Sequence, residues 1–215
     1  MLRIDAGVAK GRRLRTVTGV IRPTGSRVRG SLFDILSSRI LNSRVLDLCA
    51  GSGSLGLEAL SRGARCCLFV DNDRRSVRMI KENLVLCGFD GKPHPHGAIR
   101  QSRIWLTDAI QGLRHLADHS CSVDIILADP PYGDAVIKDI IQTVGERVIL
   151  APGGLLVIEH RGEDVLDSCV GLDPVRRRDI GETTLSFFEA DSVKAVTKTP
   201  VLPIDLPPPS SRAHR

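Results

Sequence analysis

The residues Asp129, Pro130, Pro131 and Tyr132 have the clearest potential for chemistry in this sequence. They follow an apolar run, 123–128, that is typical of a buried parallel strand, so they lie where that strand ends. The two prolines fix two φ angles, remove two backbone donors and hold the aspartate extended. A rigid carboxylate, bare carbonyl groups and an aromatic ring can bind a flat, amino-bearing ring, which favours a nucleobase. The alternative is a stiff loop with a surface tyrosine.

A glycine turn at the end of another apolar strand is the second candidate. Gly51, Gly53 and Gly56 satisfy the dinucleotide fingerprint G-x-G-x-x-G, and Asp71 follows Gly51 by 20 residues. This spacing keeps a nicotinamide enzyme open as an alternative. The carboxylate of Asp47 beside the turn would repel a pyrophosphate and attract an ammonium group. A phosphate-free cofactor with an amino-acid end and a nucleoside end, such as S-adenosylmethionine, therefore fits better.

Further acids follow the strands. Asp71 could accept hydrogen bonds from ribose hydroxyls and Asp108 from an adenine amino group, while the helix N-terminus near Ser54 could receive the cofactor carboxylate. Each acid also has a structural alternative, because Asp71 or Asp73, and likewise Asp108, could cap the helix that follows. These acids and Asp129 all fall at the carboxyl ends of strands, where open α/β sheets bind ligands.

Positive charge is concentrated at the N-terminus. Residues 1–30 contain eight Lys or Arg and one acid, whereas the remaining 185 residues contain 22 basic and 24 acidic residues. Such a segment suits contact with a phosphate backbone, and the alternative is a solvated basic arm. Residues 26–41 show apolar residues at helical spacing with Ser26 as a plausible N-cap, and Arg27 and Arg29 fall outside the apolar stripe, so they could face a ligand.

The elements that must position these residues alternate along the chain. Residues 2–6 and 12–17 suggest a β-hairpin, and 174–179 with 183–189 suggest an antiparallel pair at a sheet edge. The alternation predicts an α/β fold with a doubly wound, mostly parallel sheet. The strands are expected at 44–48, 66–71, 103–106, 123–128 and 154–159. The helices are expected at 54–62, 73–87, 108–117 and 134–148.

Composition sets the cellular context. A chain of 215 residues, 42% of them apolar, can build one domain with a substantial core. It contains no membrane-length apolar run and no signal-peptide pattern, so we expect a cytoplasmic protein. The six cysteines show no paired spacing and are interpreted as buried apolar residues. His94 and His96 are interpreted as part of a polar loop, and no metal site is expected.

Taken together, these segments resemble the RsmD family of class I S-adenosylmethionine-dependent methyltransferases, which methylate the exocyclic N2 amino group of a guanine in 16S ribosomal RNA. The resemblance runs from about residue 2 to residue 189. The glycine turn and Asp-Pro-Pro-Tyr alone indicate amino-methyltransferases in general, and the contiguous basic block and extended turn are more specific. The similar segments are GRRL at 11–14, RPTGSRVRGSLFDIL at 22–36, DLCAGSGSLGLEALSRGA at 47–64, ADPPY at 128–132, LAPGGLLVIEH at 150–160 and GETTLSFF at 181–188.

The resemblance implies a seven-stranded, Rossmann-like sheet with an antiparallel edge strand, a basic RNA-binding hairpin and helix at 1–41 and a methyltransferase domain at 42–190. The last stretch, 191–215, is rich in proline and has no periodic apolar pattern, so we expect it to be a flexible tail. The resemblance also implies a monomer that acts on 16S rRNA or the small ribosomal subunit. The residues implied to bind the cofactor are Asp47, Cys49, Ala50, Gly51, Gly53, Asp71, Asn72 and Asp108. Those implied to bind the target base are Asp129, Pro130, Pro131 and Tyr132. Those implied to bind RNA are Arg12, Arg13, Arg22, Arg27 and Arg29.

The chain also departs from the family pattern. Gly30 stands where an acid is common, Asp71 replaces a more usual Glu, and the PHPHG segment and the Pro-rich tail have no counterpart. Two other functions stay open at this point. One is a DNA adenine-N6 methyltransferase, because the same acceptors suit either amine, although no additional domain for reading duplex DNA is apparent. The other is a non-catalytic RNA-binding or ribosome-assembly protein on the same fold.

Overall fold

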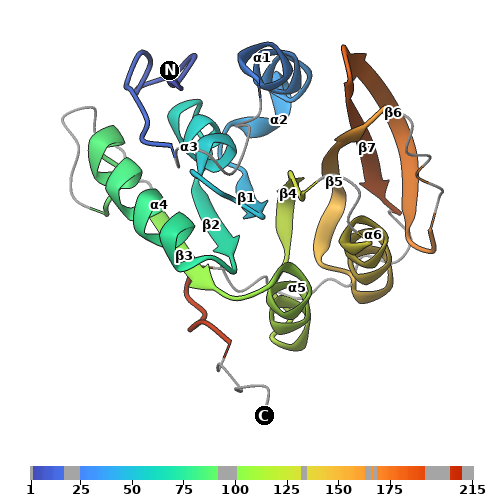
Figure 1. Ribbon diagram of the computed structural model, residues 1–215. Coiled ribbons are helices and arrows are strands. Elements are labelled where there is room, and N and C mark those ends of the chain that lie inside the picture. Colours follow the sequence, from blue (N-terminus) through green and yellow to red (C-terminus); the bar gives the residue numbers. More distant parts are fainter. Residues whose placement is uncertain are drawn as a thin grey trace.

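The architecture is three-layered, with one seven-stranded sheet between two layers of helices (Figure 1). The computed structural model describes residues 2–16, 25–91, 101–131, 135–162, 166, 169–191 and 204–209. The strands are β1 (Arg44–Leu48), β2 (Cys66–Asp71), β3 (Gln101–Leu106), β4 (Val123–Ala128), β5 (Leu150–Arg161), β6 (Leu172–Ile180) and β7 (Thr183–Ala190). The helices are α1 (Ser26–Ile35), α2 (Ser37–Ile40), α3 (Ser54–Ser61), α4 (Arg74–Cys87), α5 (Ala109–Asp118) and α6 (Val136–Arg147).

The sheet has the order β3-β2-β1-β4-β5-β7-β6. Strands β1 to β5 pair in parallel, β7 is antiparallel to β5, and β6 is antiparallel to β7. This confirms the predicted doubly wound α/β sheet with an antiparallel pair at its edge. The order reverses between β1 and β4, which is the topological switch point at which such sheets bind ligands.

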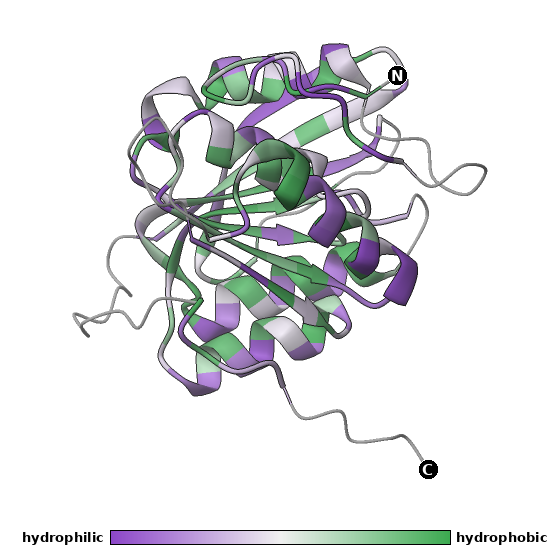
Figure 2. Ribbon diagram, turned by 90° about the vertical axis from the view of Figure 1, so that its left-hand side faces the viewer, coloured by the Kyte–Doolittle hydropathy of each residue, from purple (hydrophilic) through white to green (hydrophobic). Residues whose placement is uncertain are grey.

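Apolar residues make up the strands at the centre of the molecule, and hydrophilic residues are frequent on the surrounding helices (Figure 2). One buried cluster joins α1, α3 and α4 to alternate residues of the strands, and the other joins α5 and α6 to the remaining ones. The cysteine prediction holds in part: Cys66, Cys67, Cys87 and Cys121 are buried, whereas Cys49 and Cys169 are half-buried, and none of the six forms a disulfide bond. Within the described residues, no helix is long and apolar enough to cross a bilayer, and no three potential metal ligands cluster together.

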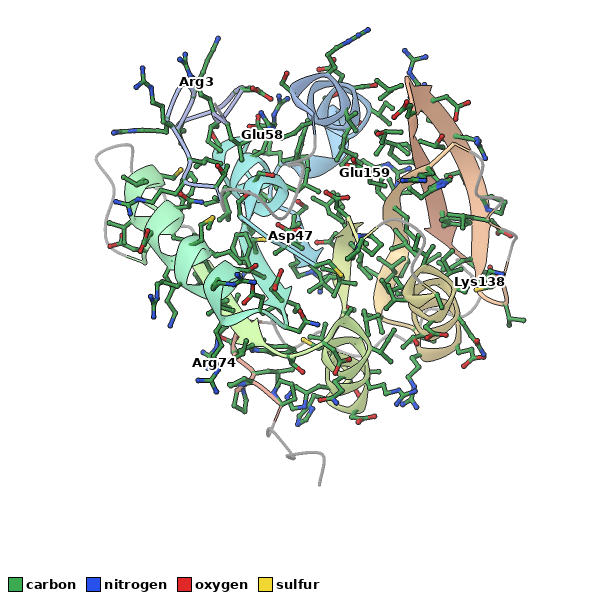
Figure 3. All side chains as sticks on the ribbon, viewed as in Figure 1. Arg3, Asp47, Glu58, Arg74, Lys138 and Glu159 are labelled. Atoms are coloured by element: carbon green, nitrogen blue, oxygen red, sulfur yellow. The ribbon has the colours of Figure 1, made fainter. Side chains whose placement is uncertain are left out.

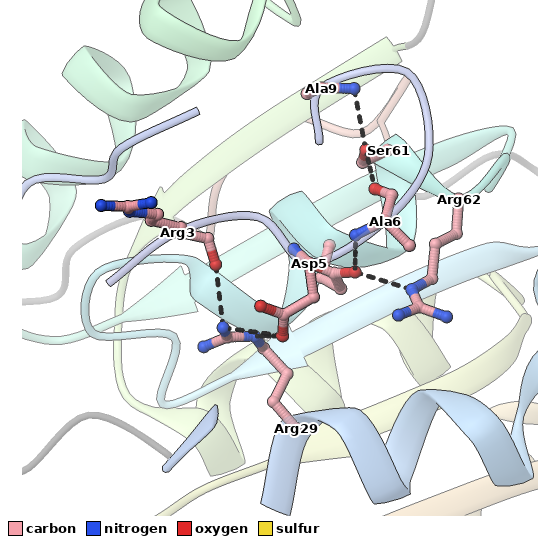
Figure 4. Close-up of polar contacts among 8 residues, drawn as sticks. Arg3, Asp5, Ala6, Ala9, Arg29, Ser61 and Arg62 are labelled. Carbon is pink, nitrogen blue, oxygen red and sulfur yellow. Dashed lines mark hydrogen bonds and ion pairs between the residues drawn. The ribbon is translucent and has the colours of Figure 1, made fainter. Parts of the chain in front are cut away.

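The N-terminal residues 2–16 are held to α3 by buried polar groups (Figure 4). The carboxylate of Glu58 accepts hydrogen bonds from the backbone N–H groups of Asp5 (2.7 Å) and Ala6 (3.0 Å) and from Arg62 Nε (2.7 Å). The hydroxyl of Ser61 accepts from the N–H of Ala9 (3.0 Å) and donates to the carbonyl of Ala6 (2.5 Å). The basic N-terminal segment is therefore built into the main domain.

The remaining differences from the sequence predictions are local. The expected hairpin is present as a single antiparallel bridge between Arg3 and Arg13. The expected helix at 26–41 divides at Leu36 into α1 and α2, and Gly25 takes the N-cap position in place of Ser26, with no side-chain capping bond.

The described part of the tail, residues 204–209, is docked on the domain. Ile204 and Leu206 are buried, Arg103 donates to the carbonyl of Ile204 (3.1 Å), and a ring nitrogen of His115 lies 3.0 Å from the carbonyl of Pro207. The prediction of a flexible tail is wrong for this segment, because its two apolar side chains are buried and its backbone carbonyls contact Arg103 and His115. The loop containing His94 and His96 lies outside the described residues.

Candidate active site

The neighbouring strands β1 and β4 bring the two predicted motifs to one edge of the sheet. Leu48 pairs with Ala128, so the glycine turn that follows β1 and Asp129, which follows β4, leave the sheet side by side. The charge of Asp129 also contributes to raising the pKa of Asp47. The two motifs therefore lie close together at this edge of the sheet.

Asp47 is a buried acid at the centre of this edge (Figure 3). Its side chain is only 1% exposed, and its Oδ2 accepts a hydrogen bond from the N–H of Gly56 at 2.8 Å. Burial raises the pKa of Asp47 well above its usual value, and the nearby charges of Asp129 and Asp71 raise it further. A cation bound beside this carboxyl group would offset the cost of ionising it.

In the glycine turn, every second residue from 49 to 53 has a left-handed backbone conformation. Cys49, Gly51 and Gly53 have φ values of 57°, 55° and 75°. Glycine adopts this region freely, whereas the conformation is uncommon for a cysteine and marks a strained point, as is frequent beside ligand sites. A side chain added at Gly51 would meet no atom within 4 Å, so the backbone there faces open space.

Asp71 closes the turn from β2. Its Oδ2 accepts from the N–H of Gly51 at 2.8 Å, and its Oδ1 accepts from the N–H of Asp73 at 2.8 Å. Burial raises its pKa. The capping role falls to Asp73, whose side chain accepts from the N–H of Arg75 at the start of α4. Each carboxylate oxygen of Asp71 keeps a second lone pair for a ligand hydroxyl.

The other predicted cofactor residues lie along the same edge. Asp108 is half-buried and caps α5 by accepting from the N–H of Gln111 at 2.8 Å, as the structural alternative predicted. That bond uses Oδ1, so capping and ligand binding are compatible. Ala50 is half-buried and donates its N–H to the carbonyl of Val70 (3.1 Å), and Asn72 is exposed beyond the end of β2.

The residues after β4 are one aspartate and two prolines, whose rings restrict the backbone. Asp129 is half-buried, Pro130 is buried and Pro131 is exposed, whereas Tyr132 lies outside the described residues. Sequence reasoning missed Glu159 on β5, which is 4% exposed. Its neighbour Ile158 pairs with Ala128, so Glu159 lies level with Asp129. The signal was available, since Glu159 is also an acid near the end of an apolar strand.

The predicted RNA-binding arginines divide into two groups. Arg12, Arg13 and Arg27 are exposed, and Arg22 lies outside the described residues. The prediction that Arg29 binds RNA is wrong, because this residue is only 1% exposed. It donates from Nε to Asp5 Oδ2 (2.9 Å) and from Nη2 to the carbonyl of Arg3 (2.8 Å).

Arg29 is buried because the buried face of α1 is wider than the apolar stripe in its sequence. Arg29 lies one helical turn before Phe33 and beside Val28, which are both buried, so it belongs to the covered side. An internal ion pair with Asp5 then compensates the buried charge.

Asn83 is a second residue that sequence reasoning missed. This fully buried amide on α4 accepts from the N–H of Arg15 (2.8 Å) and donates to the carbonyls of Arg15 (3.1 Å) and Ser52 (2.9 Å). It thus joins the N-terminal segment to the glycine turn. No sequence pattern marks an asparagine in mid-helix for this role, because it depends on a contact 68 residues away.

Residues 2–189 match the family model described as "Conserved hypothetical protein 95". The chain belongs to this family. It is the RsmD family, as the sequence resemblance indicated, and a putative rRNA methyltransferase of Bacillus subtilis, YlbH, is 33% identical over 190 residues that cover 87% of this chain and 98% of that protein.

Other relatives agree with the RsmD family. The ribosomal RNA small subunit methyltransferase D of Haemophilus influenzae is 33% identical over 159 residues, covering 74% of this chain and 78% of that protein. A solved structure of a putative methyltransferase from Escherichia coli, yhhF, superposes with a TM-score of 0.72 at 27% identity and covers 89% of this chain and 98% of that chain. The fold and the family are therefore those of a class I methyltransferase, which argues against the nicotinamide alternative.

Proposed function

We propose that this protein transfers a methyl group from S-adenosylmethionine to the exocyclic N2 amino group of a guanine in 16S rRNA of the small ribosomal subunit. One observation carries the proposal: in a chain of the RsmD family, the turn around Asp47 and the rigid Asp129-Pro130 corner leave adjacent strands at one edge. The names of the relatives support rRNA as the substrate. The exposed Arg12, Arg13 and Arg27 would contact its phosphates.

The residues at the edge fit the proposed cofactor. Asp47 is buried and its pKa is raised by that burial; an ammonium group bound beside it would favour its ionised form, whereas a phosphate there would disfavour it. Asp71, one strand away, has lone pairs free for ribose hydroxyls, and Asp108 lies at the end of the third strand for the adenine amino group. When bound, S-adenosylmethionine supplies an electrophilic methyl group on a sulfonium.

The chain's own residues prepare the acceptor. The lone pair of a guanine N2 is delocalised into the ring, so the amino group is a weak nucleophile. Asp129 and the carbonyl of Pro130 would accept its two hydrogens, turn the lone pair away from the ring and stabilise the positive charge that develops on nitrogen. Because Pro130 fixes this corner, little conformational freedom is lost on binding. Holding the amine in line supplies much of the remaining rate enhancement.

Two further residues would complete the base site. Tyr132 would stack on the extruded base, as expected for enzymes that modify a base outside its helix. Glu159 lies level with Asp129 on the neighbouring strand, so it would offer a second acid to the edge of a bound guanine. Guanine carries a ring N–H beside its amino group, and a carboxylate can accept from such a donor, whereas adenine lacks it.

The test offers the full-length protein isotopically labelled S-adenosylmethionine together with small ribosomal subunits, naked 16S rRNA and duplex DNA, and then maps the labelled base. The proposal predicts label on N2 of a guanine in the small-subunit RNA. Label on adenine N6 of duplex DNA would support the DNA methyltransferase alternative. Cofactor binding without transfer to any nucleic acid would support a non-catalytic role. Either of these two results overturns the proposal.

A further inference from the structure

The edge strand β6 carries three consecutive arginines, and two of them project freely into solvent. Arg176, Arg177 and Arg178 are all exposed. Arg177 is neutralised, because it pairs with Asp179 at 3.1 Å and donates to the carbonyl of Gly162. Within the described parts of the chain, the side chains of Arg176 and Arg178 have no hydrogen-bond or ion-pair partner.

Strand register places these arginines level with the candidate active site. Ala128, which precedes Asp129, pairs with Ile158 of β5; Ile158 pairs with Ser186 of β7. Ser186 in turn pairs with Arg177 of β6. Three strand spacings separate the two ends of this row, a distance of about 14 Å. The arginines therefore lie beside the edge at which the target base would bind.

Arg176 and Arg178 also share a face with the N-terminal extension. Side chains of directly paired residues point to the same side of a sheet, and these two arginines pair with Phe187 and Leu185. Both of those residues belong to the apolar cluster that includes Leu32 of α1. Arg176 and Arg178 therefore extend from the face that α1 covers, and α1 carries the exposed Arg27.

The two basic regions flank the site. The N-terminal residues 2–16 contact α3 and α4 on one side of β1, whereas β6 ends the sheet on the other side of β4 and β5 (Figure 1). A polyanion that lies across the carboxyl edge would meet positive charge at both ends and Asp129 between them.

We propose that Arg176 and Arg178 form a second contact surface for the phosphate backbone of the RNA substrate, so that the RNA is held on both sides of its target base. This inference rests on the proposed RNA substrate and extends it to a surface outside the N-terminal segment. Charged residues on an edge strand also discourage strand pairing between molecules. Replacement by glutamine removes the charge, and a variant that stays monomeric but binds RNA more weakly separates the two roles.

The experiment measures binding of a 16S rRNA fragment to the full-length protein over a series of salt concentrations. The double variant Arg176→Gln with Arg178→Gln is compared with a control of equal charge loss, Arg114→Gln with Lys138→Gln, whose exposed side chains lie on α5 and α6. Loss of two phosphate contacts predicts that the slope of log K against log salt becomes shallower by about 1.5, with a several-fold loss of affinity at low salt. The control should retain the wild-type slope.

The results separate this inference from the proposed reaction. If the β6 variant matches the control in slope and affinity, the second contact surface is disproved, whatever the methyl-transfer assay shows. If the slope of the β6 variant becomes shallower while the wild-type protein methylates no RNA, the second contact surface is supported and the proposed methyl transfer is disproved. Cofactor affinity and thermal stability should match the wild type in both variants. A change in either would mean that altered folding causes the loss of RNA affinity, which would contradict a direct contact.

Discussion

Two buried carboxylates on α3 and β1, Glu58 and Asp47, show how the protein uses an interior charge in opposite ways. Glu58 is fully buried, and three N–H donors from the N-terminal segment and Arg62 satisfy it. Asp47 is equally buried, but within the described residues it has one donor, the N–H of Gly56, and its pKa is raised. The chain completes the first group by itself, whereas the second keeps acceptor capacity, which suits the proposed cofactor contact.

This difference separates a region for stability from a region for binding. Charges that the protein pairs fully serve to fix geometry, here the position of residues 2–16 on α3. A buried acid with few partners is costly for folding and is typical of functional sites. The comparison therefore predicts that replacing Glu58 mainly lowers stability, whereas replacing Asp47 mainly weakens cofactor binding.

The largest effect is expected at Glu58. Glu58→Ala removes the acceptor for two backbone N–H groups and for Arg62, so the free energy of unfolding should fall by about 3 kcal/mol. Denaturant titration measures the loss, and RNA affinity should fall with it because the N-terminal segment is released. Asp34→Ala, a change of an exposed acid on α1, serves as the control. A loss below about 1 kcal/mol would contradict the anchoring role of Glu58.

A smaller effect is expected where the N-terminal segment approaches α3 most closely. Gly7 and Gly11 both have φ of 81°, so an alanine is equally strained by backbone conformation at either position. A Cβ at Gly7 would lie 1.9 Å from the carbonyl oxygen of Ser61, whereas one at Gly11 would meet nothing within 4 Å.

Gly7→Ala should therefore destabilise the protein by about 2 kcal/mol more than Gly11→Ala does, since only the first forces the packed backbone apart. Thermal or denaturant unfolding of the two variants measures the difference. Equal losses would show that the close contact contributes nothing beyond backbone strain.

Replacement of Asp47 should have the smallest effect on stability, and its sign depends on pH. Because the folded state raises the pKa of this carboxyl group, folding takes up a proton, and the free energy of unfolding falls as pH rises from about 4 towards the raised pKa. Asp47→Asn removes this contribution and keeps an oxygen that can accept from Gly56. The variant should therefore lose stability less steeply over that range of pH.

The same variant should bind S-adenosylmethionine at least tenfold more weakly, because the proposed ammonium partner is gone. Unfolding at a series of pH values and calorimetry measure the two effects. Asp118→Asn, at an exposed acid, is the control. Parallel stability curves for Asp47→Asn and wild type would contradict the assignment of a raised pKa.

The sequence predicted the central sheet well because its strands are short apolar runs bounded by glycines and acids. The bounds of β1, β2 and β4 match the predicted ranges, and α3 to α6 differ from theirs by one or two residues at an end. The site acids followed from the rule that open α/β sheets bind ligands at the carboxyl ends of their strands.

What the sequence could not give depends on contacts between distant segments. An arginine in a basic stretch was interpreted as an RNA contact, yet Arg29 pairs with Asp5 inside the fold. The roles of Glu58 and Asn83 arise from backbone groups more than fifty residues away in the sequence. Docking of 204–209 rests on two apolar side chains that form no periodic pattern.

The most direct test of the central claim compares turnover with cofactor affinity in Asp129→Ala. If Asp129 orients the target amine beside the donor, transfer of label to small-subunit RNA should fall by about 100-fold or more, as for removal of a group that stabilises a transition state. The dissociation constant for S-adenosylmethionine, measured by calorimetry, should change less than about threefold, since Asp47 and Asp71 hold the cofactor. Equal losses of turnover and cofactor affinity, or undiminished turnover, would contradict the joined site proposed for the ends of β1 and β4.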